Sequence, residues 1–121
     1  LVVKPEFGCP TGEAYRKYDE SPLEIHGGLE RFTAGLPGNY APEMYNVFQR
    51  LYSDKRIEDI CARLTALGAK GAMLTGSGSG VFGVFDNEAN AKRASGEFPG
   101  CFTAVSGCVR EGVSITEREV L

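Results

Sequence analysis

The stretch of sequence that decides the fold runs from Leu74 to Phe85 and reads LTGSGSGVFGVF. Glycine and serine alternate from Gly76 to Gly80, a pattern that permits a tight turn and close approach of other groups. Apolar runs lie on both sides, at 71–75 and 81–85, and the second run is rich in the β-branched and aromatic residues that favour strands. The stretch therefore predicts two strands joined by a glycine–serine turn.

The turn itself has three interpretations: a bare hairpin loop, a nucleotide-binding loop, or a loop that abuts a phosphate site built elsewhere. Residues 78–83 match the spacing G-x-G-x-x-G. A dinucleotide site needs a helix directly after the glycines, however, and here a strand is predicted. A protein-kinase glycine loop is followed by a strand that carries a lysine, whereas the next lysine, Lys92, lies in a predicted helix. The first and third interpretations stay open.

The composition is that of one globular domain of 121 residues, with 42% apolar and 24% charged residues. The net charge of −3 and the pI of about 5.2 argue against nucleic acid or an anionic membrane as a partner. No apolar run approaches the roughly 18 residues of a membrane span. The four cysteines form no C-x-x-C pair, which argues against a zinc site and suits a reducing, cytoplasmic location.

Hydrophobic periodicity predicts the other elements. The clearest helix spans 57–67, where apolar residues recur at helical spacing and Gly68 ends the pattern. The remaining predictions are a strand at 1–3, a helix at 12–18 capped by Thr11, a helix start at Ser21–Pro22, an apolar helical turn at 29–32, a helix that begins at Pro42 and includes Leu51, a helix at 88–97 capped at Asp86–Asn87, a strand at 101–105, and an edge strand or tail at 109–121.

This order of elements predicts an α+β fold, with an antiparallel or mixed sheet of about four strands and helices on one face. The succession strand, strand, helix, strand in the second half resembles a ferredoxin-like topology. The chain begins at Leu1, without a methionine and inside a predicted strand. We therefore expect it to be a piece of a longer protein that is divided at a domain boundary.

The residues alone show no complete active site. Ser77 and Ser79 are candidate exposed hydroxyl groups, but no histidine lies near them in the sequence to act as a base. The one histidine, His26, is interpreted as a loop residue without a catalytic role. We expect no catalytic residue and no metal ligand in this chain.

Residues 68–85, GAKGAMLTGSGSGVFGVF, resemble the third conserved motif of the GHMP small-molecule kinases, and the alanine-bearing segment 89–94 resembles the helix that follows this motif in the family. Two further segments, 2–15 (VVKPEFGCPTGEAY) and 46–48, resemble the branch of the family that phosphorylates 4-diphosphocytidyl-2-C-methyl-D-erythritol. Together the similar segments cover nearly the whole chain.

The resemblance implies that residues 1–121 form a single domain, the C-terminal, substrate-side domain of a longer two-domain kinase. Such an enzyme uses ATP and Mg²⁺ to phosphorylate the 2-hydroxyl group of the cytidylylated methylerythritol, in non-mevalonate isoprenoid biosynthesis. Its phosphate loop and its catalytic aspartate and lysine belong to the N-terminal domain, which is the expected partner of this chain. We therefore expect the chain alone to be inactive and to bind no cofactor.

The resemblance also implies site residues. The glycine–serine turn is expected to border the cleft between the two domains, and Thr11 is expected to lie near the small-molecule substrate. The cleft residues are Gly76, Ser77, Gly78, Ser79 and Gly80. Two alternatives stay open: another GHMP kinase, such as mevalonate or homoserine kinase, and a ferredoxin-like regulatory module that binds a small molecule.

Overall fold

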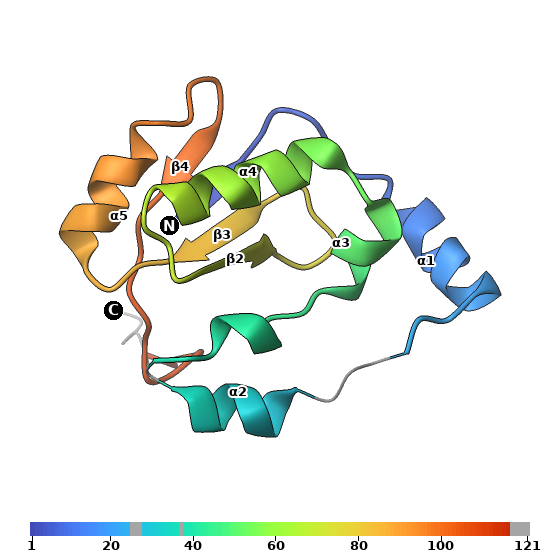
Figure 1. The fold of residues 1–121 in the computed structure, drawn as a ribbon, viewed down its shortest axis with the longest axis horizontal. Coiled ribbons are helices and arrows are strands. Elements are labelled where there is room, and N and C mark those ends of the chain that lie inside the picture. The colour runs from blue at the N-terminus through green and yellow to red at the C-terminus, as the bar shows by residue number, and fades with distance from the viewer. Residues whose placement is uncertain (25–27, 37, 117–121) are drawn as a thin grey trace, which may run out of the picture.

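The computed structural model describes residues 1–24, 28–36 and 38–116. Figure 1 shows the arrangement of the helices and strands. In chain order these are β1 (Val2–Lys4), α1 (Thr11–Glu20), α2 (Leu29–Gly35), the short 3₁₀ helix η1 (Ala41–Glu43), α3 (Val47–Tyr52), α4 (Lys55–Ala66), β2 (Gly71–Leu74), β3 (Val81–Val84), α5 (Glu88–Ser95) and β4 (Phe102–Ala104). None of the helices in these ranges combines the length and the apolar character that crossing a bilayer requires.

The four strands form one antiparallel sheet in the order β2-β3-β1-β4. The hairpin of β2 and β3 pairs Leu74 with Val81 and Met73 with Phe82, and β1 pairs Val3 with Val81. Because side chains alternate along a strand, Leu74, Val81 and Val3 lie on one face of the sheet, and Met73 and Phe82 lie on the other. The predicted α+β fold with a four-stranded sheet is confirmed.

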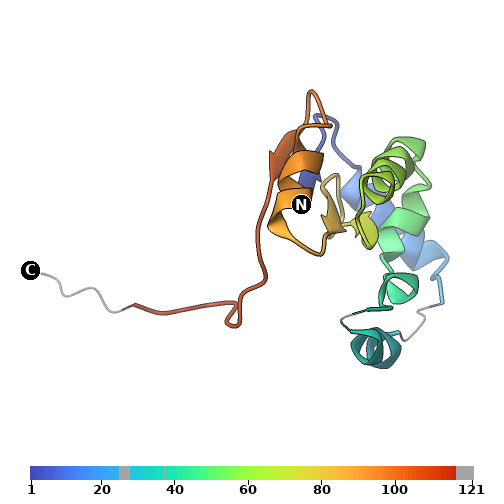
Figure 2. The same ribbon diagram turned by 60° about the vertical axis from the view of Figure 1, so that its left-hand side comes forward.

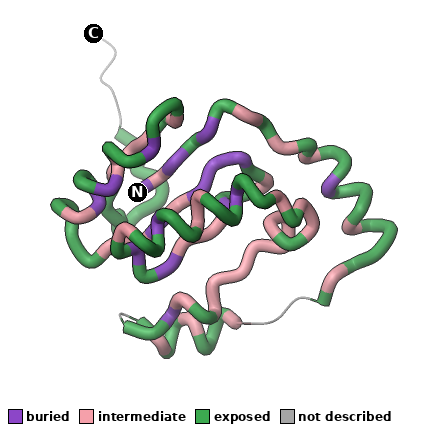
Figure 3. Tube along the Cα trace, turned by 45° about the horizontal axis from the view of Figure 1, so that its top comes forward, coloured by how far each residue is buried: buried purple, intermediate pink, exposed green. Residues whose placement is uncertain are grey.

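Helices α4 and α5 cover the first of these faces (Figure 1). Ile57 and Leu64 of α4 and Ala94 of α5 are buried there with the strand residues, and Figure 3 shows buried positions gathered along the strands. Burying each large aliphatic side chain contributes about 1.5–3 kcal/mol. The helix lies close to the sheet: a Cβ atom at Gly83 would lie 3.1 Å from Leu64 Cδ2.

Helix α4 confirms the predicted helix and its end before Gly68, but it begins at Lys55, two residues before the predicted start at 57. At its start the Asp54 side chain accepts a hydrogen bond from the Arg56 amide, which satisfies one free backbone N–H group. At its end Gly68 adopts φ of 104°, and the Ala69 amide donates to the Leu64 carbonyl at 3.0 Å. This is the Schellman arrangement that a glycine after the last helical turn favours.

The helix predicted to begin at Pro42 is wrong. Pro42 lies in η1, the chain extends at Met44 (ψ 123°), and α3 begins afresh after Asn46. The Asn46 side chain accepts hydrogen bonds from the amides of Phe48 and Gln49, so it is the N-cap of a new helix. The apolar spacing across 44–51 hid this boundary.

Two start signals near α1 are also corrected. Thr11 does not cap the helix: it is the first helical residue, Pro10 precedes it, and its hydroxyl group is directed to another partner. Ser21 does not begin a helix, because its amide donates to the Lys17 carbonyl and so ends α1. His26 lies outside the described residues.

After residues 105–108, which lie beside the sheet, the chain leaves the body of the molecule (Figure 2). The alternating apolar residues in 109–121 permitted the prediction of an edge strand, but residues 109–116, the described part of this segment, form no strand. Val109, Val113 and Ile115 are 79%, 82% and 91% exposed. Of the two open predictions for this segment, a tail is therefore the one that its described residues support.

Candidate functional site

The predicted glycine–serine turn is the loop of residues 75–80, named here the Gly/Ser loop, which joins β2 to β3. The Gly78 amide donates to the Thr75 carbonyl at 3.1 Å, and the Thr75 amide donates to the Gly80 carbonyl at 2.9 Å. Gly76 and Gly78 adopt φ of 56° and 85°, conformations that cost residues with a Cβ atom about 1–2 kcal/mol. The glycines are thus required by the path of the backbone.

Side-chain amides from α3 and its cap hold one side of this loop. Asn46 Nδ2 donates to the carbonyls of Leu74 (2.8 Å) and Gly76 (2.9 Å), and Gln49 Oε1 accepts from the Leu74 amide at 2.8 Å. Because β2 is at the edge of the sheet, these amides replace the hydrogen bonds that a neighbouring strand would make. Sequence reasoning did not find Gln49, and it noted Asn46 only through the resemblance.

Ser79 is buried rather than exposed, which corrects the prediction made for its hydroxyl group. Ser79 is 1% exposed. Its hydroxyl group donates a hydrogen bond to the Phe7 carbonyl and accepts one from Lys4 Nζ at 2.9 Å. A hydroxyl with both functions engaged inside the protein is a structural group. Ser79 therefore anchors the Gly/Ser loop and presents no free nucleophile.

Ser77 lies at the half-buried outer side of the loop and contacts Thr11, which is distant in sequence. Thr11 Oγ1 donates to Ser77 Oγ at 3.2 Å, and the Tyr52 hydroxyl donates to the Ser77 carbonyl at 2.9 Å. Burial raises the pKa of Tyr52, so this donor stays protonated at neutral pH. The structure thus brings together Thr11 and the Gly/Ser loop, and it adds Tyr52, which sequence reasoning missed. We name Thr11 and Ser77 the hydroxyl rim.

The Arg56 and Asp54 side chains near the rim are paired with each other. The Arg56 guanidinium bonds the Asp54 carboxylate at 2.7 Å and lies over the Phe7 ring, 3.9 Å from its centre. The hydrogen bond from Arg56 lowers the pKa of Asp54. Cys9 Sγ packs beside the loop, and burial is the main reason that the pKa of its thiol is raised. The rim therefore presents neutral hydroxyl groups rather than a free cation.

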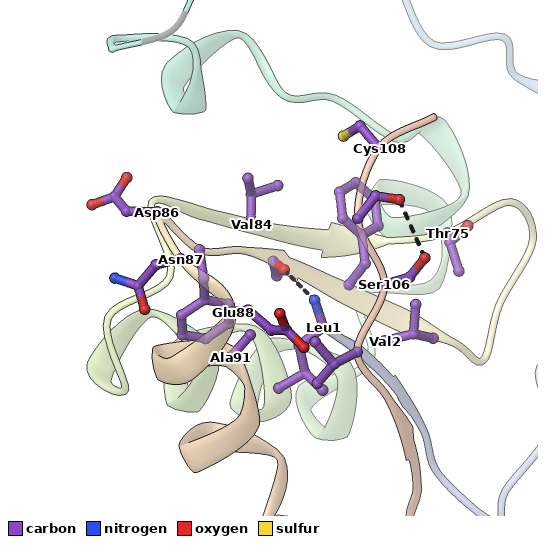
Figure 4. Close-up of a pocket in the computed structure, with 15 residues that line it drawn as sticks. Leu1, Val2, Thr75, Val84, Asp86, Asn87, Glu88, Ala91, Ser106 and Cys108 are labelled. Atoms are coloured by element: carbon purple, nitrogen blue, oxygen red, sulfur yellow. Dashed lines mark hydrogen bonds between the residues drawn. The ribbon is translucent and has the colours of Figure 1, made fainter. Parts of the chain in front are cut away.

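A separate cavity of about 690 Å³ lies between the sheet and the segment that follows β4 (Figure 4). Thr75 is on its wall near Ser106, while Asp86 and Asn87 lie at the opposite end. The Leu1 nitrogen donates to the Gly83 carbonyl within it at 2.9 Å. Apart from Thr75, the residues of the Gly/Ser loop do not line this cavity.

Across the described ranges, no three acidic, histidine or cysteine side chains gather closely enough to hold a metal ion. The described residues therefore offer no compact set of protein ligands that would hold a metal ion by themselves.

A family model described as "GHMP kinases C terminal" matches residues 25–103. Among curated proteins, the chain is similar to 4-diphosphocytidyl-2-C-methyl-D-erythritol kinases. That of Clostridium novyi (strain NT) is 34% identical over 99 residues, which cover 77% of this chain and 35% of the relative. That of Caldanaerobacter subterraneus subsp. tengcongensis is 32% identical over 123 residues, which cover 95% of this chain and 43% of the relative.

One solved structure is also similar, a crystal structure of 4-(cytidine 5'-diphospho)-2C-methyl-D-erythritol kinase. The TM-score is 0.66 at 25% sequence identity, over 79% of this chain and 37% of the solved one. The relatives are thus longer: the matched part of this chain spans 35% of the Clostridium novyi protein and 43% of the Caldanaerobacter protein.

Proposed function

The chain belongs to the GHMP kinase family of ATP-dependent phosphotransferases, and from this premise we propose that it is the C-terminal, substrate-side domain of a two-domain kinase. The proposed reaction transfers the γ-phosphoryl group of ATP to the 2-hydroxyl group of 4-diphosphocytidyl-2-C-methyl-D-erythritol. The similarity to kinases of that name supports this choice of acceptor over mevalonate or homoserine.

The observation that carries the proposal is the contact between Thr11 and the Gly/Ser loop. Two segments that resemble family motifs, 66 residues apart, meet through the Thr11–Ser77 hydrogen bond. Neutral hydroxyl groups can donate to and accept from the hydroxyl groups of a polyol. The rim therefore suits the alcohol acceptor, whereas a triphosphate requires cations or a cradle of backbone amides.

In this proposal the N-terminal region supplies the phosphate loop, the magnesium site and the catalytic aspartate and lysine. Near the Gly/Ser loop, Arg56 is paired with the Asp54 carboxylate, and the Lys4 ammonium group donates to the Pro5 carbonyl and to the Ser79 hydroxyl group. Phosphoryl transfer depends on positioned cations around the transferred group. We therefore expect the 121-residue chain by itself to transfer no phosphate.

The test is an ATP-dependent phosphorylation assay with the chain joined to its N-terminal region and three acceptors: 4-diphosphocytidyl-2-C-methyl-D-erythritol, mevalonate and homoserine. We expect turnover with the first acceptor, and none when the 121-residue chain is assayed alone. Preference for mevalonate or homoserine would replace the proposed substrate while keeping the kinase. Turnover by the 121-residue chain alone would overturn the proposed division of labour between the domains.

Calorimetry separates the kinase domain from the second candidate, a small-molecule-binding regulatory module. If the chain alone binds an amino acid or a nucleotide tightly, a complete ligand site lies within it, and the regulatory interpretation replaces the proposed one. We expect no such binding, because the rim is one side of a site.

A further inference from the structure

The segment that runs from the last residue of β1 to the first residue of α1 contacts the Gly/Ser loop at three successive places. We name residues 4–11 the connector. Ser79 contacts Lys4 and Phe7 of the connector, Gly78 contacts Cys9, and Ser77 contacts Thr11. The connector and the loop thus run in opposite directions where they touch: later residues of the connector contact earlier residues of the loop. Sliding the connector along the loop would break all three contacts together.

Lys4 provides the most extensive of these contacts. Its ammonium group has three N–H donors, and it lies 2.8 Å from the Pro5 carbonyl, 2.9 Å from Ser79 Oγ and 3.4 Å from the Phe7 carbonyl. Ser79 has a single hydroxyl proton, which it donates to the Phe7 carbonyl, so its oxygen is the acceptor for Lys4. The direction of each hydrogen bond is therefore determined by chemistry alone.

We propose that Lys4 is a positioning residue for the kinase site: its ammonium group joins the connector to buried Ser79, and this sets the position of Thr11 against Ser77. The step from position to substrate binding rests on the proposed function. The step from Lys4 to the geometry of the loop rests only on the contacts above. Lys4 acts through Ser79 and Phe7 and is not assigned a contact with ATP or the acceptor.

The shape of the lysine head group is part of the inference. The three acceptor oxygens lie around a single nitrogen atom, which suits the compact ammonium group. A guanidinium group spreads its donors over a planar fork and does not match such a cluster. Arginine at this position would keep the positive charge but would not place three donors around one nitrogen atom. Lys4→Arg therefore separates the effect of the charge from the effect of the head-group shape.

The first experiment measures amide hydrogen exchange in the 121-residue chain. In Lys4→Met, the amides of residues 76–80 should exchange about tenfold faster or more, while those of α5 keep their rates, because a local restraint is lost. Lys92→Met is the matched control, since Lys92 pairs with Glu88 on the exposed side of α5. An equal acceleration in every element, or none in residues 76–80, would overturn the proposal.

Two further variants keep the test decisive. Ser79→Ala removes the partner, so combining it with Lys4→Met should add little to either single change, whereas independent roles would give additive effects. If Lys4→Met does not fold, Ser79→Ala alone should show the same local acceleration. Lys4→Arg should resemble Lys4→Met. Exchange as slow as in the unmodified chain would show that charge suffices and would contradict the geometric role.

The second experiment measures kinetics in the chain joined to its N-terminal region. Lys4→Met should raise KM for the acceptor about tenfold, with kcat changed less than about twofold and KM for ATP unchanged, because only acceptor positioning is altered. Loss of stability alone would lower the active fraction and leave both KM values unchanged. If no acceptor is phosphorylated, the proposed function fails, while the exchange experiment still decides the role of Lys4.

Discussion

The Gly/Ser loop and the segment 109–116 contrast in composition and in environment. The loop consists of residues typical of flexible linkers, yet side chains from the connector and from α3 bond it on both sides. The segment after β4 carries Val113 and Ile115 in a strand-like alternation, yet both are exposed. Whether a segment is held in place therefore depends on hydrogen-bonding and packing partners elsewhere in the chain rather than on its own composition.

The largest expected effect tests how closely the loop is packed. Gly78→Ala should lower the free energy of unfolding by about 3 kcal/mol, from unfavourable φ and from overpacking. The added Cβ atom would lie 2.8 Å from Cys9 Sγ. Gly76→Ala is the matched control: its φ is also positive, but the site is open, so a loss of about 1 kcal/mol is expected. Denaturant unfolding with equal losses in both variants would show that Cys9 does not confine the loop.

The second prediction concerns the bonds from α3. Asn46→Ala should cost about 2 kcal/mol, because it removes a helix cap together with two hydrogen bonds to the backbone of Leu74 and Gly76. Asn87→Ala removes only the cap of α5 and should cost about 1 kcal/mol. The comparison is made by denaturant unfolding. Equal costs would mean that the two bonds to the loop contribute nothing to stability.

The third prediction compares one cysteine beside the loop with one after β4. Cys108 is exposed, whereas Cys9 is partly buried and burial raises the pKa of its thiol. Because the thiolate is the reactive form, a raised pKa leaves less of it at pH 8, so Cys9 should react with a disulfide reagent about tenfold more slowly than Cys108. The rate at Cys9 should rise at higher pH. Cys9→Ser and Cys108→Ser assign the phases of these two among the four free cysteines, and equal rates at pH 8 would contradict the packed environment of Cys9.

The smallest effect is expected after β4. Val113→Ser should change the free energy of unfolding by less than about 0.5 kcal/mol, because its side chain is already in water. A loss of more than about 1 kcal/mol in the 121-residue chain would show that this segment packs against a surface and would remove the contrast with the loop.

The sequence predicts those parts of the fold that depend on interactions between residues close together in the chain. Helix α4 and the β2–β3 hairpin were predicted correctly, because apolar periodicity, Gly68 and the turn glycines are local signals. The helix break at Asn46 was missed, since apolar residues on both sides continue the helical spacing.

The site was predicted only in part for the same reason. The resemblance named Thr11 and the Gly/Ser loop, and the structure brings them together. The bond between Lys4 and Ser79 joins residues 75 positions apart, so no local pattern announces it, and a glycine–serine run gives no sign that one serine is buried. Expecting Thr11 to cap α1 overlooked that its hydroxyl has a tertiary partner.

The most direct test of the central claim is the kinetic effect of Thr11→Val in the chain joined to its N-terminal region. If the hydroxyl rim lies on the acceptor side as proposed, KM for 4-diphosphocytidyl-2-C-methyl-D-erythritol should rise about tenfold while KM for ATP stays unchanged. Thr65→Val, on the exposed side of α4, should leave both values unchanged. A rise in KM for ATP with KM for the acceptor unaltered would contradict the account.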